Sequence, residues 1–142
     1  RPWQHVLEPI SGMLLLASKL WNKPHSYNES WNFGPNLSAN ITVKELVIQI
    51  IKEMKQKVYW KDMSKKTKKS VHEANFLRLD STKASNLLGW RQVYSIKETI
   101  SETASWYENY ANKTEMRKFT ESQIEKYVEK AKYMNTVWTT KK

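Results

Sequence analysis

The side chains that could carry out acid–base or metal chemistry are few and far apart in this sequence. The 142 residues include three histidines, His5, His25 and His72, in separate segments, and no cysteine. A zinc-binding helix of the His-Glu-x-x-His type needs a second histidine four residues after the first, but Phe76 stands there after His72-Glu73. Without cysteine, disulfides, thiolate metal sites and cysteine nucleophiles are excluded. We therefore expect no metal site, and no Ser, His and Asp grouping indicates a hydrolase triad.

Glycines that would let the backbone approach a phosphate are equally sparse. The three glycines, Gly12, Gly34 and Gly89, are widely separated along the chain. A dinucleotide-binding loop or a Walker loop needs several glycines within about ten residues. The sequence therefore predicts that this chain builds neither loop.

The charge is strongly positive but carried mainly by lysine. The 24 basic residues outnumber the 14 acidic ones, for a formal net charge of +10, and the arginines are Arg1, Arg78, Arg91 and Arg117. Lysine is the more strongly hydrated of the two cations, and arginine is the better phosphate reader. The densest run, 61–69, is either a solvated loop or a polyanion site. A basic nucleic-acid-binding domain is thus an alternative, but no basic stripe interleaves with aromatic residues, and we expect no nucleic-acid partner.

Three capping boxes indicate where the longer helices begin. In a capping box a Ser or Thr stands three residues before a Glu or Gln, and each side chain satisfies the other's backbone amide. The boxes are Thr42-Val-Lys-Glu45, Ser95-Ile-Lys-Glu98 and Thr120-Glu-Ser-Gln123. Apolar residues follow each box at helical spacing, and in the third helix they extend to Trp138.

The remaining elements are shorter. Residues 13–17 are apolar on every side, which predicts a helix that is buried on several sides. A short helix over 81–88 is expected to open at Asp80 or Ser81 and to end at Gly89. Short strands are expected at 3–6, 30–33, 58–60 and 76–79.

These elements predict one α/β domain over residues 1–142 that is mostly helical with a few short strands. No apolar run approaches the roughly 20 residues that a membrane span requires. No secretory signal pattern is present. We therefore expect a cytoplasmic protein with no membrane partner.

Four segments occur in an order and spacing that resemble one protein family. They are Arg1-Pro-Trp-Gln-His-Val-Leu-Glu-Pro9, His72-Glu-Ala-Asn-Phe-Leu-Arg-Leu-Asp80, Leu88-Gly-Trp90 and Met116-Arg-Lys-Phe-Thr-Glu-Ser-Gln-Ile124. Together they resemble the C-terminal part of the extended short-chain dehydrogenase/reductases (the NAD-dependent epimerase/dehydratase family), and within them the CDP-glucose 4,6-dehydratase subgroup. The resemblance runs from Arg1 to about Tyr127.

The resemblance implies a role for particular residues. The chain would be the substrate-binding portion, with the Rossmann nucleotide-binding core absent and residues 1–35 completing the sheet of that core. Arg1 would lie near the nucleotide diphosphate, because a guanidinium matches phosphate oxygens, and Glu8 would open a helix that lines the cleft. His72 and Glu73 would contact the nucleotide or its ribose, or equally anchor a loop.

The resemblance also implies an activity for the parent enzyme. Such an enzyme uses NAD to convert CDP-glucose to CDP-4-keto-6-deoxyglucose and water, for deoxysugar and lipopolysaccharide synthesis. The family's Tyr-x-x-x-Lys pair does not occur in this chain. The chain alone is therefore expected to bind no NAD and to be inactive.

The expected partners follow from the same resemblance. They are a weakly bound CDP-sugar, the missing N-terminal cofactor domain and a second copy of the chain, because the apolar segment 13–17 would otherwise expose its surface. A non-catalytic module that binds a nucleotide-sugar or a protein partner is the alternative.

Overall fold

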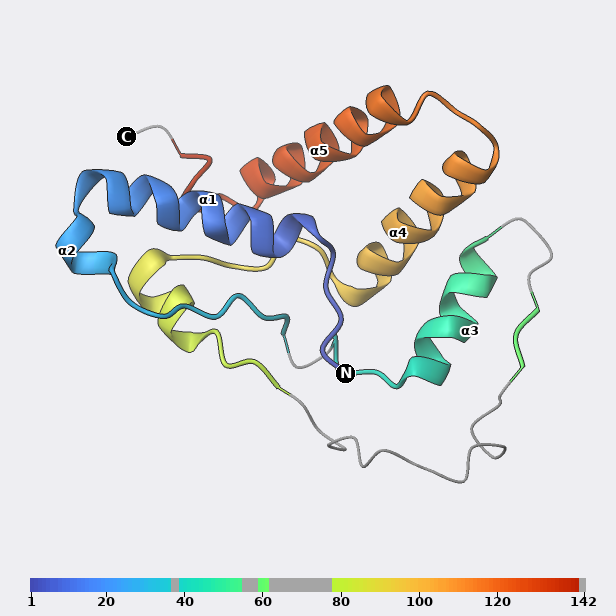
Figure 1. The fold of residues 1–142 in the computed structure, drawn as a ribbon, viewed down its shortest axis with the longest axis horizontal. Helices are drawn as coiled ribbons and strands as arrows, with labels where there is room; N and C mark the ends of the chain where they lie inside the picture. The colour runs from blue at the N-terminus through green and yellow to red at the C-terminus, as the bar shows by residue number, and fades with distance from the viewer. Residues whose placement is uncertain (37–38, 55–58, 62–77, 141–142) are drawn as a thin grey trace.

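Helices make up nearly all of the regular structure. The computed structural model describes residues 1–36, 39–54, 59–61 and 78–140. Its elements are α1 (Leu7–Asn22), α2 (Pro24–Tyr27), α3 (Val43–Glu53), the π-helical turn η3 (Ala84–Leu88), α4 (Ile96–Ala111) and α5 (Met116–Tyr133) (Figure 1). α4 and α5 form a helical hairpin, α3 packs along α4, and α1 contacts α2 and η3. Within the described residues, no helix is both long and apolar enough to cross a bilayer.

The predicted strands are wrong wherever the structure describes them. Segments 3–6 and 30–33, and the described parts of 58–60 and 76–79, contain no strand. Strand-like pairing among the described residues is limited to an isolated antiparallel bridge between Pro2 and Asn40. A strand is stable only when a neighbour completes its hydrogen-bond ladder. The fold is therefore mostly helical, as expected, but not α/β in its described part.

Two of the three capping boxes are confirmed. The Thr42 hydroxyl accepts from the Glu45 amide at 3.1 Å, and the Glu45 carboxylate accepts from the Thr42 amide at 2.7 Å. Ser95 and Glu98 make the same pair of hydrogen bonds at 3.3 and 2.8 Å. Both boxes open the helices that were predicted, α3 and α4.

The third capping box is wrong, because α5 already begins at Met116. Thr120 therefore lies inside the helix, where its hydroxyl accepts a hydrogen bond from Nε1 of Trp106 at 3.0 Å. Gln123 donates to the backbone oxygen of Glu102 at 2.9 Å. The two polar residues tie α5 to α4 rather than capping a helix start.

The expected extension of this last helix to Trp138 is also wrong. α5 ends at Tyr133, and Asn135 adopts a left-handed conformation with φ 52°. The chain turns back there, so that the Trp138 ring stacks on the Tyr127 ring with centroids 6.2 Å apart. The apolar spacing of Trp138 reflects this packing and not a helical position.

The short helix before Gly89 is confirmed. The chain is helical from residue 82 through η3, and Gly89 ends it at φ 71°. A left-handed residue at a helix end is the conformation that glycine adopts without strain. Asp80 supports the start by accepting a hydrogen bond from the Thr82 amide at 2.8 Å.

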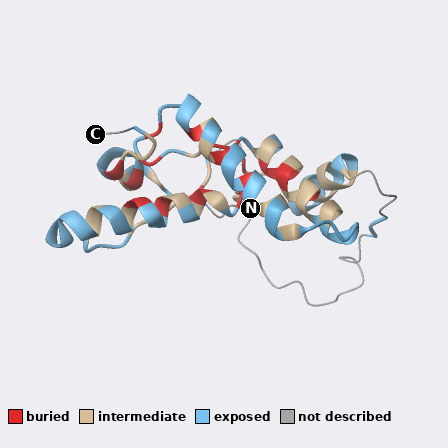
Figure 2. Ribbon diagram, turned by 90° about the horizontal axis from the view of Figure 1, so that it is seen from above, coloured by how far each residue is buried: buried red, intermediate tan, exposed pale blue. Residues whose placement is uncertain are grey.

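The core consists of two clusters on the inner sides of the helices (Figure 2). The first contains Leu15, Ala84, Leu88 and Trp90, and the second contains Val93, Tyr94, Tyr127 and Ala131. The expectation that residues 13–17 are buried on several sides is wrong for the described chain. Leu15 is 7% exposed, but Met13 and Leu14 are 56% and 67% exposed.

Glu8 attaches α1 to the second of these clusters. Its carboxylate is fully buried and accepts hydrogen bonds from the amides of Val93 and Tyr94, at 3.0 and 2.7 Å, and from the Tyr127 hydroxyl at 2.9 Å. Burial raises the pKa of Glu8, although these donors, led by the Tyr94 and Val93 amides, act in the opposite direction. One side chain of α1 thus holds both the 93–94 segment and α5.

We predict that Glu8→Ala destabilises the fold by about 3 kcal/mol or more, because it leaves the two buried amides of Val93 and Tyr94 without an acceptor and removes one partner of the Tyr127 hydroxyl. Tyr127→Phe removes one donor and leaves the carboxylate with two others, so it should cost about 1 kcal/mol. Urea unfolding measures both values. The exposed Glu125→Ala on α5 is the control, and a Glu8→Ala effect no larger than that of the control would contradict the role of Glu8.

A second prediction concerns pH and the ion pair between α4 and α5. Burial alone would raise the pKa of Glu98, but the contacts of Lys130 and of Ser95 outweigh burial and lower it from 4.5 to about 2. Because the folded pKa lies below the unfolded one, the carboxylate stabilises the fold at pH values above about 4.5 and loses this effect as the pH falls towards 2.

Glu98→Gln should therefore lower the Tm at pH 7, and the difference from the parent chain should shrink steadily as the pH falls from about 4.5 to 2. Thermal unfolding followed by circular dichroism at a series of pH values measures this. A difference that stays constant down to pH 2.5 would show that Glu98 acts through something other than its charge.

Candidate functional site

The structure places the two ends of the Arg1 to Pro9 motif in different environments. Arg1 lies at the surface, and its terminal amino group donates to the Ile41 carbonyl at 3.1 Å. Glu8 is fully buried and hydrogen-bonded within the core, so the expectation that it lines a substrate cleft is wrong. His72 and Glu73 lie outside the described residues. A site made of Arg1, His72 and Glu73 therefore stays a prediction.

A pocket of about 750 Å³, with both polar and apolar lining residues, lies beside the segment that follows His72-Glu73 in the chain. We call it the Arg78–Arg91 pocket, because two of the four arginines line it and both are exposed. Its walls come from three segments that are far apart in the sequence: 34–36, 78–85 and 90–92, with Met134 at one side.

Side-chain to backbone hydrogen bonds hold these three segments together. The Ser81 hydroxyl accepts from the Gly34 amide at 2.7 Å and donates to the Gly34 carbonyl at 3.1 Å. Oε1 of Gln92 accepts from the Asn36 amide at 2.7 Å. A Cβ added at Gly34 would lie 2.5 Å from Cβ of Leu79, so only glycine permits this close approach. The pocket is a built feature of the fold and not a gap between loops.

The pocket has the chemistry of an anion site. Arg78 and Arg91 carry guanidinium groups, which bind phosphate and carboxylate oxygens in a bidentate manner. Asp80 also lines the pocket, and hydrogen bonds from the side chain and then the amide of Thr82 lower the pKa of its carboxyl group. Its negative charge offsets one guanidinium group, so that these three side chains together leave one net positive charge. In the described part of the chain no group of three or more His, Asp or Glu could hold a metal ion.

The sequence interpretation did not single out Arg78 and Arg91. A signal was available, since these two of the four arginines directly flank the Asp80 to Trp90 stretch. What the sequence does not show is that residues 34–36 close the pocket from the other side.

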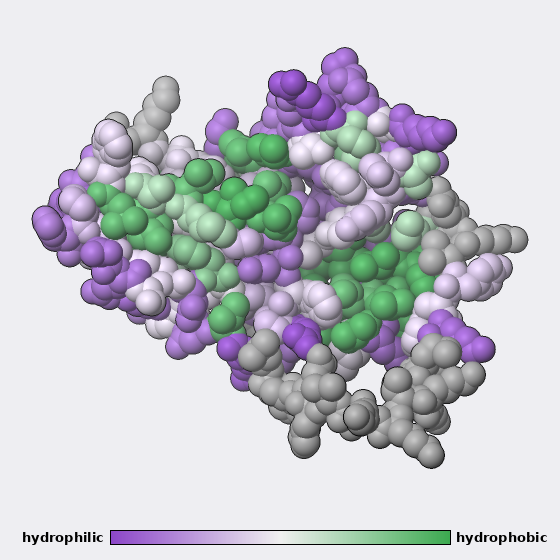
Figure 3. Space-filling view, viewed as in Figure 1, coloured by the Kyte–Doolittle hydropathy of each residue, from purple (hydrophilic) through white to green (hydrophobic). Residues whose placement is uncertain are grey.

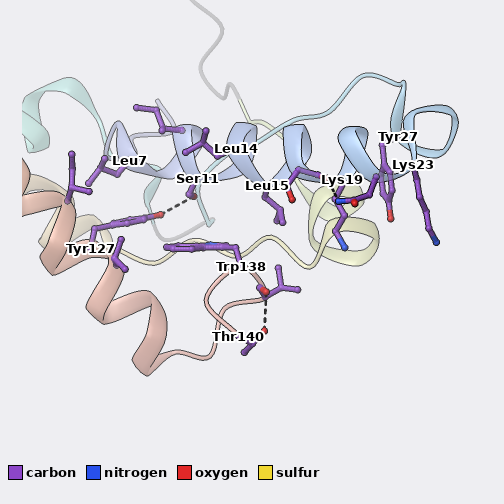
Figure 4. Close-up of a pocket in the computed structure, with 16 residues that line it drawn as sticks. Leu7, Ser11, Leu14, Leu15, Lys19, Lys23, Tyr27, Tyr127, Trp138 and Thr140 are labelled. Carbon is purple, nitrogen blue, oxygen red and sulfur yellow. Dashed lines mark hydrogen bonds between the residues drawn. The ribbon is translucent and has the colours of Figure 1, made fainter. Parts of the chain in front are cut away.

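A second hollow, the α1–α5 groove, runs between α1, α5 and the turn that follows α5 (Figure 4). Its volume is about 920 Å³, and most of its lining is apolar. The hydroxyls of Ser11 and Tyr127 are 3.1 Å apart across it. Lys19 and Lys23 line it near the C-terminal end of α1.

None of the three glycines belongs to a phosphate-binding loop that could hold NAD. A Cβ at Gly12 would lie 2.4 Å from Cδ1 of Phe33, so Gly12 permits α1 to pack on the 31–35 segment. Gly34 closes on Leu79, and Gly89 ends η3. Each glycine is used in packing or in a turn, and the residues present do not fit a dinucleotide phosphate.

Comparison with known proteins gives a partial match. No protein-family model matches the chain. The chain is 31% identical over 131 residues to a CDP-glucose 4,6-dehydratase from Salmonella typhimurium. The match covers 90% of this chain and 35% of that protein, so the chain spans about a third of the relative's length. This chain is homologous to a part of CDP-glucose 4,6-dehydratase.

Proposed function

We propose that this chain forms the nucleotide-sugar-binding part of a CDP-glucose 4,6-dehydratase, and that the Arg78–Arg91 pocket receives the diphosphate. The match over 90% of the chain supports this proposal, and the observation that carries it is that the exposed Arg78 and Arg91 line one pocket. A diphosphate presents several anionic oxygens, and two guanidinium groups suit it better than scattered lysines do.

The proposal includes the residues that the sequence comparison suggested. His72 and Glu73 precede Arg78 by six and five residues in the sequence, and we propose that they contact the nucleotide. An imidazole and a carboxylate side by side can hydrogen-bond a ribose or a base edge. Arg1 does not line the pocket, so its expected contact with the diphosphate is a separate part of the proposal.

In this proposal the chain itself does not bind NAD. In the parent enzyme NAD would accept a hydride from the hexose and return it. Because the residues of this chain do not fit a dinucleotide, they would bind and orient the nucleotide-sugar and take no part in hydride transfer. A cofactor-binding portion would have to supply that chemistry and the opposite wall of the cleft.

The outer face of α1 is the surface on which such a portion would dock. Val6, Met13 and Trp21 are 62%, 56% and 90% exposed. Figure 3 shows a run of hydrophobic surface over α1. Large exposed apolar patches usually mark an interface. We propose that this patch, the α1 outer face, packs on the cofactor-binding portion, or on a second copy when that portion is absent.

We predict that the chain binds CDP-glucose weakly and that Arg78→Gln with Arg91→Gln weakens binding about tenfold or more, because charge-assisted hydrogen bonds are lost. Isothermal titration calorimetry measures this. Arg117→Gln is the control, because Arg117 pairs with Glu121 on α5 and lies outside the pocket. Equal affinity of the double variant and the control would remove the pocket from the proposal.

The same titration tests the contribution of His72. His72→Ala should cost about 1–3 kcal/mol of binding free energy if the imidazole bonds the ligand in a buried position. A lowered Tm with unchanged affinity would instead assign His72 to the structure of its segment.

We also predict that the isolated chain self-associates through the α1 outer face. Met13→Glu should shift the chain towards the monomer in light scattering, because a carboxylate is costly to bury in an apolar contact. Tyr133→Glu is the matched control at a side chain that is 89% exposed at the end of α5. A parent chain that stays monomeric up to millimolar concentration would contradict this use of the surface.

A further inference from the structure

The α1–α5 groove is apolar over one part of its length and cationic at one end. Leu7, Ile10 and Leu14 of α1 face Val128 and Trp138 from the α5 side. Figure 4 shows Trp138 lying beneath α1 on this side of the groove. The volume of about 920 Å³ falls in the range of about 300–1,000 Å³ that is typical of small-ligand pockets.

The polarity of the lining changes along α1. From Leu7 to Leu15 the lining residues are apolar apart from Ser11, whereas from Ser18 to Lys23 they are polar or cationic. At 1.5 Å per residue, the stretch from Leu7 to Asn22 is about 23 Å long. No acidic residue occurs among the described lining residues. The groove therefore presents a long apolar wall and a positive charge at one end.

We propose that the α1–α5 groove binds a single-chain aliphatic carboxylate, with its hydrocarbon chain along the apolar wall and its carboxylate at Lys19 and Lys23. A ligand that is apolar along its length and anionic at one tip matches the charge distribution of the groove. The apolar wall is partly open, since Ile10 and Leu14 are 40% and 67% exposed, so a ligand can enter the groove from solvent.

The test is calorimetric titration of the 142-residue chain with dodecanoate below its micelle concentration. We expect saturation at one ligand per chain. Octanoate should bind at least about tenfold more weakly, since each buried methylene contributes to affinity. Dodecyltrimethylammonium has the same hydrocarbon chain with the opposite charge, and we expect it to bind at least about threefold more weakly, the range of a solvent-exposed ion pair.

Matched variants separate the site from the general positive charge. Lys19→Gln with Lys23→Gln should weaken dodecanoate binding about threefold or more, and should leave the affinity for dodecanol unchanged. Lys97→Gln with Lys132→Gln removes the same charge outside the groove and should have no effect. Leu14→Gln should weaken binding, whereas Met13→Gln at the adjacent position, which does not line the groove, should not.

Three results would overturn the proposal: no saturable binding of dodecanoate, equal binding of the cationic amphiphile, or the same loss in both double-lysine variants. The proposal does not depend on the nucleotide-sugar site. CDP-glucose titration of the same variants should be unchanged, so that failure at the groove and failure at the Arg78–Arg91 pocket are distinguishable.

Discussion

The buried carboxylate of Glu8 is the interaction on which the rest of the structure depends. A charged group without exposure is costly unless donors surround it. Here the amides of Val93 and Tyr94 and the Tyr127 hydroxyl all donate to it. These partners come from two other segments, so α1, the 93–94 segment and α5 have one common point of attachment. Apolar packing alone, which has no direction, would not fix α1 at this angle.

Both candidate sites follow from that attachment. With Val93 and Tyr94 held by Glu8, the preceding residues Arg91 and Gln92 face the 34–36 segment, where Gln92 accepts from the Asn36 amide. On the other side, α1 and α5 meet through polar contacts such as the one between Ser11 and Tyr127. The α1–α5 groove lies beside this contact, and Ser11 and Tyr127 both line it. The attachment of α1 at Glu8 therefore helps to position both hollows.

The features that were predicted correctly from the sequence are those that depend on residues close together in the chain. The boxes at Thr42 and Ser95 and the stop at Gly89 involve residues a few positions apart, and all three are confirmed. The box at Thr120 and the helix at Trp138 failed because distant partners decided them, Trp106 in one case and Tyr127 in the other. The pocket was missed for the same reason, since residues 34–36 and 78–92 meet only in the fold. Arg1, His72 and Glu73 came from the family resemblance, and their role stays a prediction.

The exposure pattern of α1 explains why one helix can carry separate binding surfaces. Residue 15 is buried in the core, residues 7 and 11 face the groove, and residues 6, 13 and 21 form the α1 outer face. A helix that is apolar on several sides needs several partners, and in the described chain the side chains of Val6, Met13 and Trp21 stay largely exposed. Leu14 lies at the border, exposed yet lining the groove. Substitutions at Met13 and Leu14, adjacent in sequence but on different sides of that border, therefore distinguish a protein contact on the outer face from a ligand in the groove.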